Sequence, residues 1–470
     1  MKSIPASLFA GMFAFWLFGP EFCRILKWVH FWAVRRPESQ GTLMKKIALL
    51  ALLPFAASAF ANELLVVDSG RDRIIKLNPA DGSLINDAFI DDQLRFDFPI
   101  EAINSGRNTI LISDANKDAI YEYSASGQFL RTVVKGPQVE SVRGIAMLNG
   151  DIVAGINGGV NMAKVVLVSY DGTSVSPLCD VAAQGASSLW GVHVRASDIL
   201  VTDSQTDAIY RFGHNGAFLN KVYDSTGVGD MNFPQGICDD GTDFWVAGFS
   251  LPTGVFKFNN TGKIQQWAID TGTRDLYKLG NGKLLWTAGQ EYGEMDVTDG
   301  SFFNYVDISG ASFRFISLMT AATRTSVSGS VDIGPMSGSA TYPIGMVAKI
   351  DNGTTTQYAP FVLTSANTYE FTTTLTGNLT VKAYQNHWLH RIFTVNVPGT
   401  SSVVGPSLTL INGDVDSSNA ITTDDYLVLS NNFDTEVEPG TLGDLDHDGF
   451  VTTDDYLILS ANFDLSGDEE

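Results

Sequence analysis

The chain has 470 residues, a formal net charge of −22 at pH 7 and 45 glycines, and this length allows two to four domains with sizeable cores. Residues 411–470 hold sixteen Asp or Glu residues and no Lys or Arg, so most of the negative charge lies there. Because no basic face exists to release the counterions of phosphates, we expect no nucleic-acid partner.

Residues 44–61 read as a secretory signal. Two lysines, an apolar run and Ala59-Phe60-Ala61 are typical of a bacterial signal peptide that is cleaved before Asn62. We therefore expect a secreted protein, either extracellular or at the cell surface. Residues 1–43 precede this signal. We interpret them either as a leader or as residues included by mistake because translation in fact starts at Met44. A membrane-spanning segment is the alternative, although its apolar run is short for a span.

Residues 62–322 repeat one pattern of short strands at intervals of 40 to 48 residues. Each unit has a β-rich run, a polar turn, a second alternating strand, a turn that commonly contains glycine, and a third strand. A further short strand precedes every unit except the first. Four short strands per unit at this period are typical of a β-propeller, and the six units predict six blades. The units begin at Leu64, Ile110, Asp151, Ile199, Phe244 and Leu284.

An orphan segment, SFRFISLMT at 312–320, follows the sixth unit. We predict that it supplies the strand missing from the first unit and closes the ring, because otherwise an unpaired sheet edge would remain. The units resemble NHL repeats and, more broadly, the six-bladed propellers of gluconolactonase-like proteins.

The central mouth of a propeller is a natural binding site, here for an unknown ligand. Gluconolactonase-like enzymes hold a metal with an acid and an amide on their inner strands, and the resemblance places Glu101, Gly144, Gly191, Gly236 and Asp275 at these positions. Two acids on separate blades, with glycine on three others, are too few to indicate a metal cage, and a metal enzyme is kept as an alternative. A polysaccharide-degrading hydrolase or lyase remains the alternative function, because the paired carboxylates that it needs meet only in space.

Several other propeller residues are interpreted as structural. Asp68, Asp114 and Asp203 recur at one position of successive units, which indicates a carboxylate that caps the backbone amides of a turn. Cys179 and Cys238 fall in different units, and both are interpreted as buried small hydrophobic residues without a bridge. Packing between blades is the preferred role of three tryptophans, Trp190, Trp245 and Trp286.

Residues 325–410 alternate apolar and polar side chains between Gly, Asn and Pro turns, which predicts a small antiparallel β-sandwich. It resembles the carboxypeptidase-regulatory-like sandwiches of secreted bacterial proteins. Within it, His387 and Trp388 suggest a ligand site, but a packed tryptophan beside a hydrated histidine is the preferred interpretation. In the propeller, His193 and His214 have no partner at the spacing of a triad or of a metal site.

Residues 411–470 contain one motif twice, offset by 30 residues, starting at Gly413 and Gly443. Oxygen-bearing side chains recur at alternate positions, and an acid falls at the twelfth, as Ca²⁺ requires of a loop that wraps around it. The candidate ligands of the first loop are Asp414, Asp416, Ser418, the carbonyl of Ala420, Thr422 and Asp425. Those of the second loop are Asp444, Asp446, Asp448, the carbonyl of Phe450, Thr452 and Asp455.

The sixth loop position is Gly449 in the second copy and Asn419 in the first, and both residue types accept the positive φ of a sharp turn. Because Ser418 removes a charge and Asn419 strains the turn, we expect two Ca²⁺ sites of which the second is stronger. A disordered acidic tail is the alternative. Apolar residues at helical spacing predict two loop–helix units that pack face to face through Tyr426, Leu429, Phe433, Tyr456, Leu459 and Phe463.

This pair of units resembles a type I dockerin module, with Asp in place of the Glu of an ordinary EF-hand at the last ligand. The resemblance implies Ca²⁺-dependent docking to a cohesin-like receptor, often in polysaccharide breakdown. The receptor-facing positions of that family correspond to Thr423, Asp424, Thr453 and Asp454, where the two acids depart from the usual Ser/Thr pair.

The sequence therefore predicts a mainly β protein: a six-bladed propeller, a small sandwich and a short α-helical calcium-binding module. We expect a binding platform attached through its C-terminal module rather than an enzyme, because no catalytic motif is recognisable.

Overall fold

The computed structural model describes residues 62–225, 227, 229–320, 323–334, 342–365, 367–399 and 401–469. The signal peptide expected at 44–61 and the segment before it lie outside these residues. Among the helices that are described, none combines the length and the apolar character needed to cross a membrane.

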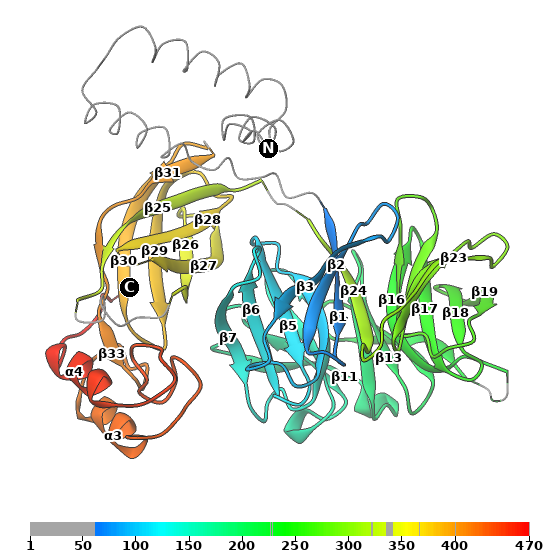
Figure 1. Cartoon of the computed structure of the whole chain (residues 1–470), viewed down its shortest axis with the longest axis horizontal. Helices are drawn as coiled ribbons and strands as arrows, with labels where there is room; N and C mark the ends of the chain where they lie inside the picture. The colour runs from blue at the N-terminus through cyan, green and yellow to red at the C-terminus, as the bar shows by residue number, and fades with distance from the viewer. Residues whose placement is uncertain are drawn as a thin grey trace, which may run out of the picture. The chain divides into compact units, whose positions relative to one another are not determined.

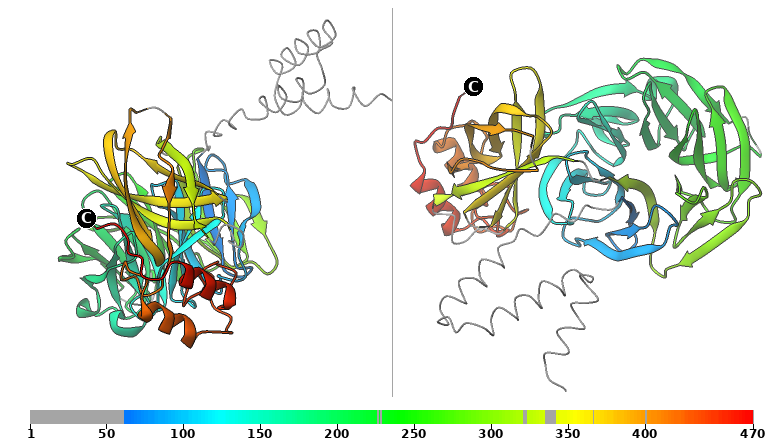
Figure 2. Two further views of the ribbon diagram at one scale, coloured as in Figure 1. Left: turned by 90° about the vertical axis from the view of Figure 1, so that its left-hand side faces the viewer. Right: turned by 90° about the horizontal axis from the view of Figure 1, so that it is seen from above.

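Residues 62–320 form six four-stranded antiparallel sheets around a central channel, which confirms the predicted propeller (Figure 2, right). Strands such as the one at residues 64–67 are buried on both faces because they lie between neighbouring blades, which explains their continuous apolar runs. Blades 2 and 3 contain β4 (Pro99–Asn104), β5 (Thr109–Asp114), β6 (Ala119–Ser124), β7 (Phe129–Lys135), β8 (Val142–Leu148), β9 (Asp151–Ile156), β10 (Lys164–Val168) and β11 (Val175–Asp180). Blades 4 and 5 contain β12 (Leu189–Val194), β13 (Ile199–Asp203), β14 (Ala208–Phe212), β15 (Phe218–Asp224), β16 (Asn232–Asp240), β17 (Asp243–Ser250), β18 (Gly254–Asn259) and β19 (Gly262–Ala268). Blade 6 contains β20 (Asp275–Lys278), β21 (Leu284–Ala288), β22 (Glu291–Met295) and β23 (Phe302–Asp307).

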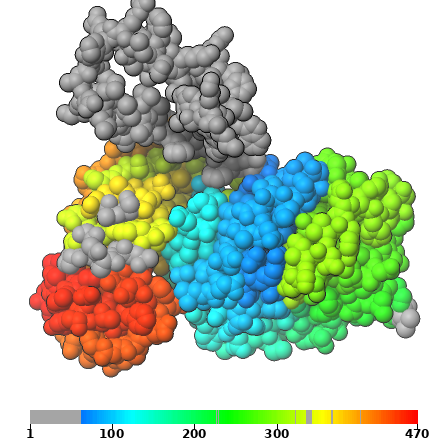
Figure 3. Space-filling view, viewed as in Figure 1, coloured from blue at the N-terminus to red at the C-terminus, as the bar shows by residue number. Residues whose placement is uncertain are grey.

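Blade 1 joins the two ends of the propeller. Its sheet order is β24-β1-β2-β3, so the orphan segment supplies the missing inner strand, as predicted (Figure 1). In Figure 3 the yellow-green end of the propeller lies directly against its blue beginning. The ring is therefore closed by hydrogen bonds between β24 and β1. The strands are β24 (Phe313–Met319), β1 (Glu63–Asp68), β2 (Arg73–Leu77) and β3 (Leu84–Asp91).

The recurring aspartates tie each turn to the start of an inner strand. Asp114 accepts hydrogen bonds from the amides of Phe98 and Lys117 at 3.0 Å each. Asp203 does the same for Ser187 and Thr206, at 2.9 and 2.8 Å. Asp68 accepts from the amides of Gly70 and Ser312. The predicted structural role of all three is confirmed.

The three tryptophans predicted to pack between blades, Trp190, Trp245 and Trp286, are buried, and the two propeller cysteines are free. Cys179 is fully buried, but Cys238 is only half-buried and lines the channel. Its predicted burial is therefore confirmed only in part, because Cys238 packs against the apolar core between blades 5 and 6 and also faces the channel.

Residues 325–414 form one hydrogen-bonded sheet of nine strands around a common core. Neighbouring strands are antiparallel except that β25 pairs in parallel with β31 and β32, a refinement of the antiparallel sandwich that was expected. His387 and Trp388 are both buried in it, so the tryptophan packs as predicted, but the histidine is not hydrated at the surface. The strands are β25 (Thr325–Asp332), β26 (Ile344–Asp351), β27 (Thr356–Ser365), β28 (Thr368–Thr373), β29 (Gly377–Gln385), β30 (His387–Val397), β31 (Ser402–Val404), β32 (Leu408–Thr409) and β33 (Asn412–Asp414).

The C-terminal segment has two helices, α3 (Thr423–Asn431) and α4 (Thr453–Ala461). Leu429 and Leu459 enter the same core as the nine-stranded sheet, so sheet and helices share one apolar interior. The aromatic residues at the other predicted packing positions, Tyr426, Phe433, Tyr456 and Phe463, remain 40–42% exposed. The predicted face-to-face packing is confirmed in part: the rings of Tyr426 and Tyr456 meet across the two helices at a centroid distance of 6.0 Å, while the sheet covers the buried side of each helix.

Candidate functional site

Two clusters of aspartates form at the duplicated loops. Asp414, Asp416 and Asp425 each place a carboxylate oxygen within 4.8 Å of the others. The second loop does the same with the three acids at equivalent positions, Asp444, Asp446 and Asp455. Residues far apart in each loop thus converge, and their hard oxygen donors suit a cation such as Ca²⁺.

The acid at the twelfth position of each loop has a second role at the helix start. Thr422 and Thr452 are the N-caps of α3 and α4, and each hydroxyl accepts from the amide two residues on, at 3.2 Å. Asp455 accepts in return from the Thr452 amide at 2.7 Å, a capping box that the first loop repeats. This box fixes the twelfth carboxylate at the centre of the loop.

The turns that bend each loop adopt the expected left-handed backbone. Gly449 has a φ of 91° and Asn419 has a φ of 66°, as predicted from their residue types. Ser417 and His447, two positions earlier, also have positive φ values, 61° and 64°, which the sequence did not indicate. Each loop therefore turns twice within three residues.

The two clusters differ in burial. All three acids of the second cluster are buried, whereas Asp416 of the first is exposed. Burial, assisted by the neighbouring acids, raises the pKa of Asp414 to about 6 and that of Asp444 to about 7. The raised pKa values reflect buried negative charges that lack compensation, and a bound cation would supply it.

Among the remaining predicted ligands, the hydroxyls of Thr422 and Thr452 each lie 3.4 Å from the carboxylate at the twelfth position, and Asp448 belongs to neither cluster of acids. Asp448 accepts from the Phe450 amide at 2.8 Å, and Ser418 donates to the Ala420 carbonyl at 3.1 Å. Four expected receptor contacts are exposed at the helix starts: Thr423, Asp424, Thr453 and Asp454.

An exposed apolar surface follows these helix starts. It consists of Tyr426 and Leu427 on α3 with Tyr456 and Leu457 on α4, which are 41–55% exposed. The two tyrosine rings meet at a centroid distance of 6.0 Å, so the surface, here called the tyrosine patch, is continuous across both helices. Exposed apolar surface of this kind is typical of a site of protein interaction.

A second candidate site is the channel of the propeller, which contains a cavity of about 580 Å³. Among the five predicted inner-strand positions, Glu101, Gly191, Gly236 and Asp275 line this cavity, and Gly144 does not. The three glycines are sterically required: a Cβ at Gly144 or Gly191 would lie 2.4–2.5 Å from a carbonyl oxygen of the next blade. Only two of the five positions therefore present functional groups.

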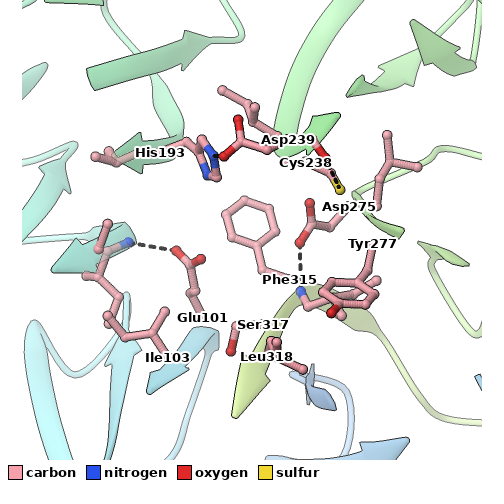
Figure 4. Close-up of a pocket in the computed structure, with 18 of the residues that line it drawn as sticks. Glu101, Ile103, His193, Cys238, Asp239, Asp275, Tyr277, Phe315, Ser317 and Leu318 are labelled. Carbon is pink, nitrogen blue, oxygen red and sulfur yellow. Dashed lines mark hydrogen bonds and ion pairs between the residues drawn. The ribbon is translucent and has the colours of Figure 1, made fainter. Parts of the chain in front are cut away.

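Glu101 and Asp275 bridge neighbouring blades. Glu101 Oε2 accepts from the Ile145 amide, and Asp275 Oδ2 accepts from the Ile316 amide, both at 2.7 Å. Burial raises the pKa of Glu101 well above its usual range, and burial raises that of Asp275 to about 8. Figure 4 shows both carboxyl groups in the channel with the Phe315 ring near its centre.

The cavity also holds a pair that sequence reasoning missed. His193 Nε2 lies 2.9 Å from Asp239 Oδ2, and both line the cavity. They come from the inner strands β12 and β16 of adjacent blades (Figure 4). Little in the sequence signals this pair, because His193 lies two residues beyond Gly191 and Asp239 lies three residues beyond Gly236, at positions that are not equivalent in the repeats.

No protein-family model matches this chain, and no curated protein matches it either. Solved structures with a similar fold include the nidogen/laminin complex, with a TM-score of 0.47, 14% identity, and coverage of 55% of this chain and 98% of that chain. Virginiamycin B lyase from Staphylococcus aureus is similar with a TM-score of 0.36 and 12% identity, over 67% of this chain and all of that chain. A type II cohesin–X–dockerin complex from Acetivibrio cellulolyticus, an interface mutant, has a TM-score of 0.24 and 23% identity, and covers 30% of this chain and 97% of that chain. These similarities concern the fold and assign no activity.

Proposed function

We propose that this chain is a secreted calcium-binding protein with two functional parts. Its dockerin-like C-terminal module attaches it, in the Ca²⁺-bound form, to a protein receptor of the cohesin type. Its propeller binds a ligand in the channel. The observation that carries the proposal is the pair of aspartate clusters, which recur at equivalent positions of two loop–helix units.

Calcium would act on the shape of the module. Each cluster joins the start of a loop to the first turn of a helix, through Asp414 with Asp425 and through Asp444 with Asp455. A cation bound there would hold α3 and α4 in a fixed relation to each other, and with them the tyrosine patch. Attachment would therefore depend on calcium even though no ligand residue belongs to the patch.

Calorimetric titration of the full secreted chain with Ca²⁺ tests the metal sites. We expect two binding events of unequal affinity. Asp444→Asn should remove the stronger event and Asp414→Asn the weaker one. Asp464→Asn, which changes an exposed acid outside both clusters, is the matched control and should leave both events intact. Absence of binding at millimolar Ca²⁺ would refute the proposal.

Attachment is tested with an immobilised type I cohesin domain as the receptor. Retention of the chain should require Ca²⁺, and it should fall when Tyr426 and Tyr456 are replaced by alanine. Retention that persists in chelator would exclude a calcium-dependent module. Calcium binding without retention would restrict the module to a stabilising role.

A second candidate function is cleavage of a polysaccharide in the propeller channel. It is favoured by the raised pKa values of Glu101 and Asp275, because a carboxylic acid that is still protonated near neutral pH can act as a general acid. Incubation with a panel of glycans and analysis of the products tests it. Activity that survives both Glu101→Gln and Asp275→Asn would exclude this site.

A further inference from the structure

Two carboxyl groups in the lining of the channel cavity, those of Glu101 and Asp275, lack a countercharge. Only backbone amides oppose the burial that raises the pKa of Glu101 and Asp275, and Asp275 raises that of Glu101 further. The cations and acids that line the rest of the cavity are engaged elsewhere: Lys278 pairs with Asp240, and His193 with Asp239. Tyr277 and Cys238, the other titratable groups of the lining, carry no positive charge.

The fold uses only one of the two carboxyl oxygens of Asp275. Its Oδ2 accepts from the Ile316 amide across the blade interface, a bond that the oxygen of an asparagine would make equally well. Its Oδ1 has no hydrogen-bond partner although the residue is 4% exposed. Gly236 makes room for this oxygen, because a Cβ there would lie 1.8 Å from it. A buried oxygen without a partner costs free energy, so a role outside the fold is indicated.

The size of the cavity limits what can occupy it. A volume of about 580 Å³ suits an organic molecule and greatly exceeds a single metal ion. Glu101 and Asp275 also belong to neither of the metal-type clusters found among the described residues. Two carboxylates are too few for a hard divalent cation, which takes six or more oxygens.

The aromatic part of the lining supports the same class of ligand. The Phe315 ring lies near the centre of the channel and the Tyr277 ring lies beside Asp275 (Figure 4). An ammonium group is attracted both to carboxylates and to the faces of aromatic rings.

We infer that the channel cavity binds a small organic amine, whose ammonium group is held by the carboxylates of Glu101 and Asp275. This inference rests on the proposal that the propeller binds a ligand and names the class of that ligand. The proton balance follows directly. Each carboxylic acid that ionises on binding releases its O–H proton to the solvent, and the ligand keeps its ammonium protons.

Two matched pairs of probes test the inference on the full chain: phenethylamine against phenethyl alcohol, and glucosamine against glucose. Members of each pair differ mainly in the charged amine. Calorimetry at about pH 6.5, in two buffers with different heats of ionisation, counts the protons released. We expect the amines to bind more tightly than the alcohols and to release up to about one proton per carboxyl group.

The variants Asp275→Asn and Glu101→Gln should each weaken amine binding by about 10- to 100-fold and reduce the proton release. Both keep an oxygen for the inter-blade hydrogen bond, so thermal melting should show that they fold. Asp307→Asn, an exposed acid on β23 of the same blade as Asp275, is the control and should bind like the parent chain.

Equal binding of amine and alcohol would overturn the inference while leaving the propeller a binding platform. Absence of amine binding at millimolar concentration, or binding that both variants leave unchanged, would also overturn it. Titration with CaCl₂ in parallel separates this outcome from failure of the calcium proposal, because the stronger Ca²⁺ binding event is lost in Asp444→Asn and not in Asp275→Asn.

Discussion

Replacement of Phe313 by alanine should open the seam of the propeller. Phe313 is fully buried at the start of β24, opposite Asp68 of β1, and its ring packs edge-on against Tyr292 at a centroid distance of 5.3 Å. Removing a buried phenylalanine side chain costs about 3–5 kcal/mol of folding free energy. For a domain of this size, each kcal/mol lowers the melting temperature by about 2–4 °C, so we expect a loss of about 6–20 °C.

The assay is thermal unfolding of the full chain, followed by calorimetry and by the β signal in circular dichroism. Phe302→Ala is the matched control, since Phe302 lies on the outermost strand of blade 6 and is 49% exposed. Its cost should stay within about 0.5 kcal/mol. If Phe313→Ala melts with the parent chain, or if both variants lose the same amount, the hydrogen-bonded seam does not limit the stability of the ring.

Three further outcomes are expected. Stability should decline as pH rises from about 4 to about 8, because folded Asp275 keeps its proton up to a pKa of about 8 while the unfolded chain releases it near 3.8. Asp275→Asn should flatten this decline by on the order of 5 kcal/mol, and chemical unfolding at several pH values measures it. The Ca²⁺ affinity of the second loop should increase with pH up to about 7 and then level off, because Asp444, whose pKa is raised to about 7, must lose its proton to bind the cation. Calorimetry across this pH range measures the affinity, and a constant value would contradict the expectation. N-terminal sequencing of the secreted protein should begin at Asn62, and a mature form that begins at Met1 would exclude the signal peptide.

The repeats made the propeller predictable because a blade is built from local contacts. Each strand pairs with the next one along the chain, so the pattern of strands and turns recurs wherever a blade does. The same regularity revealed the orphan segment. The first unit lacks its inner strand, and the strand that follows the sixth unit supplies it. The duplicated loops were predictable for a similar reason: the ligand spacing of a cation-binding loop lies within twelve residues.

Contacts between repeats were not predictable, because they depend on distances across the ring. His193 and Asp239 are 46 positions apart and meet only because adjacent blades bring their inner strands together. The burial of Asp275 depends on Gly236, a residue of another blade. Likewise, Tyr426 and Leu429 have the same spacing signal on α3, and only the position of the nine-stranded sheet decides which of them is buried.

The way in which the C-terminal module is joined to the sheet determines how it would transmit force. β33 carries Asp414 and is the edge strand that pairs with β30, while Asp468 near the chain end accepts from the Ile392 amide of β30 at 2.7 Å. A force applied at α3 or α4 would therefore reach the sheet through two attachment points, the β33–β30 pairing and the Asp468–Ile392 hydrogen bond, and not through a single flexible linker. Because the first aspartate loop begins within β33, a cation bound there would stiffen the junction through which that load passes.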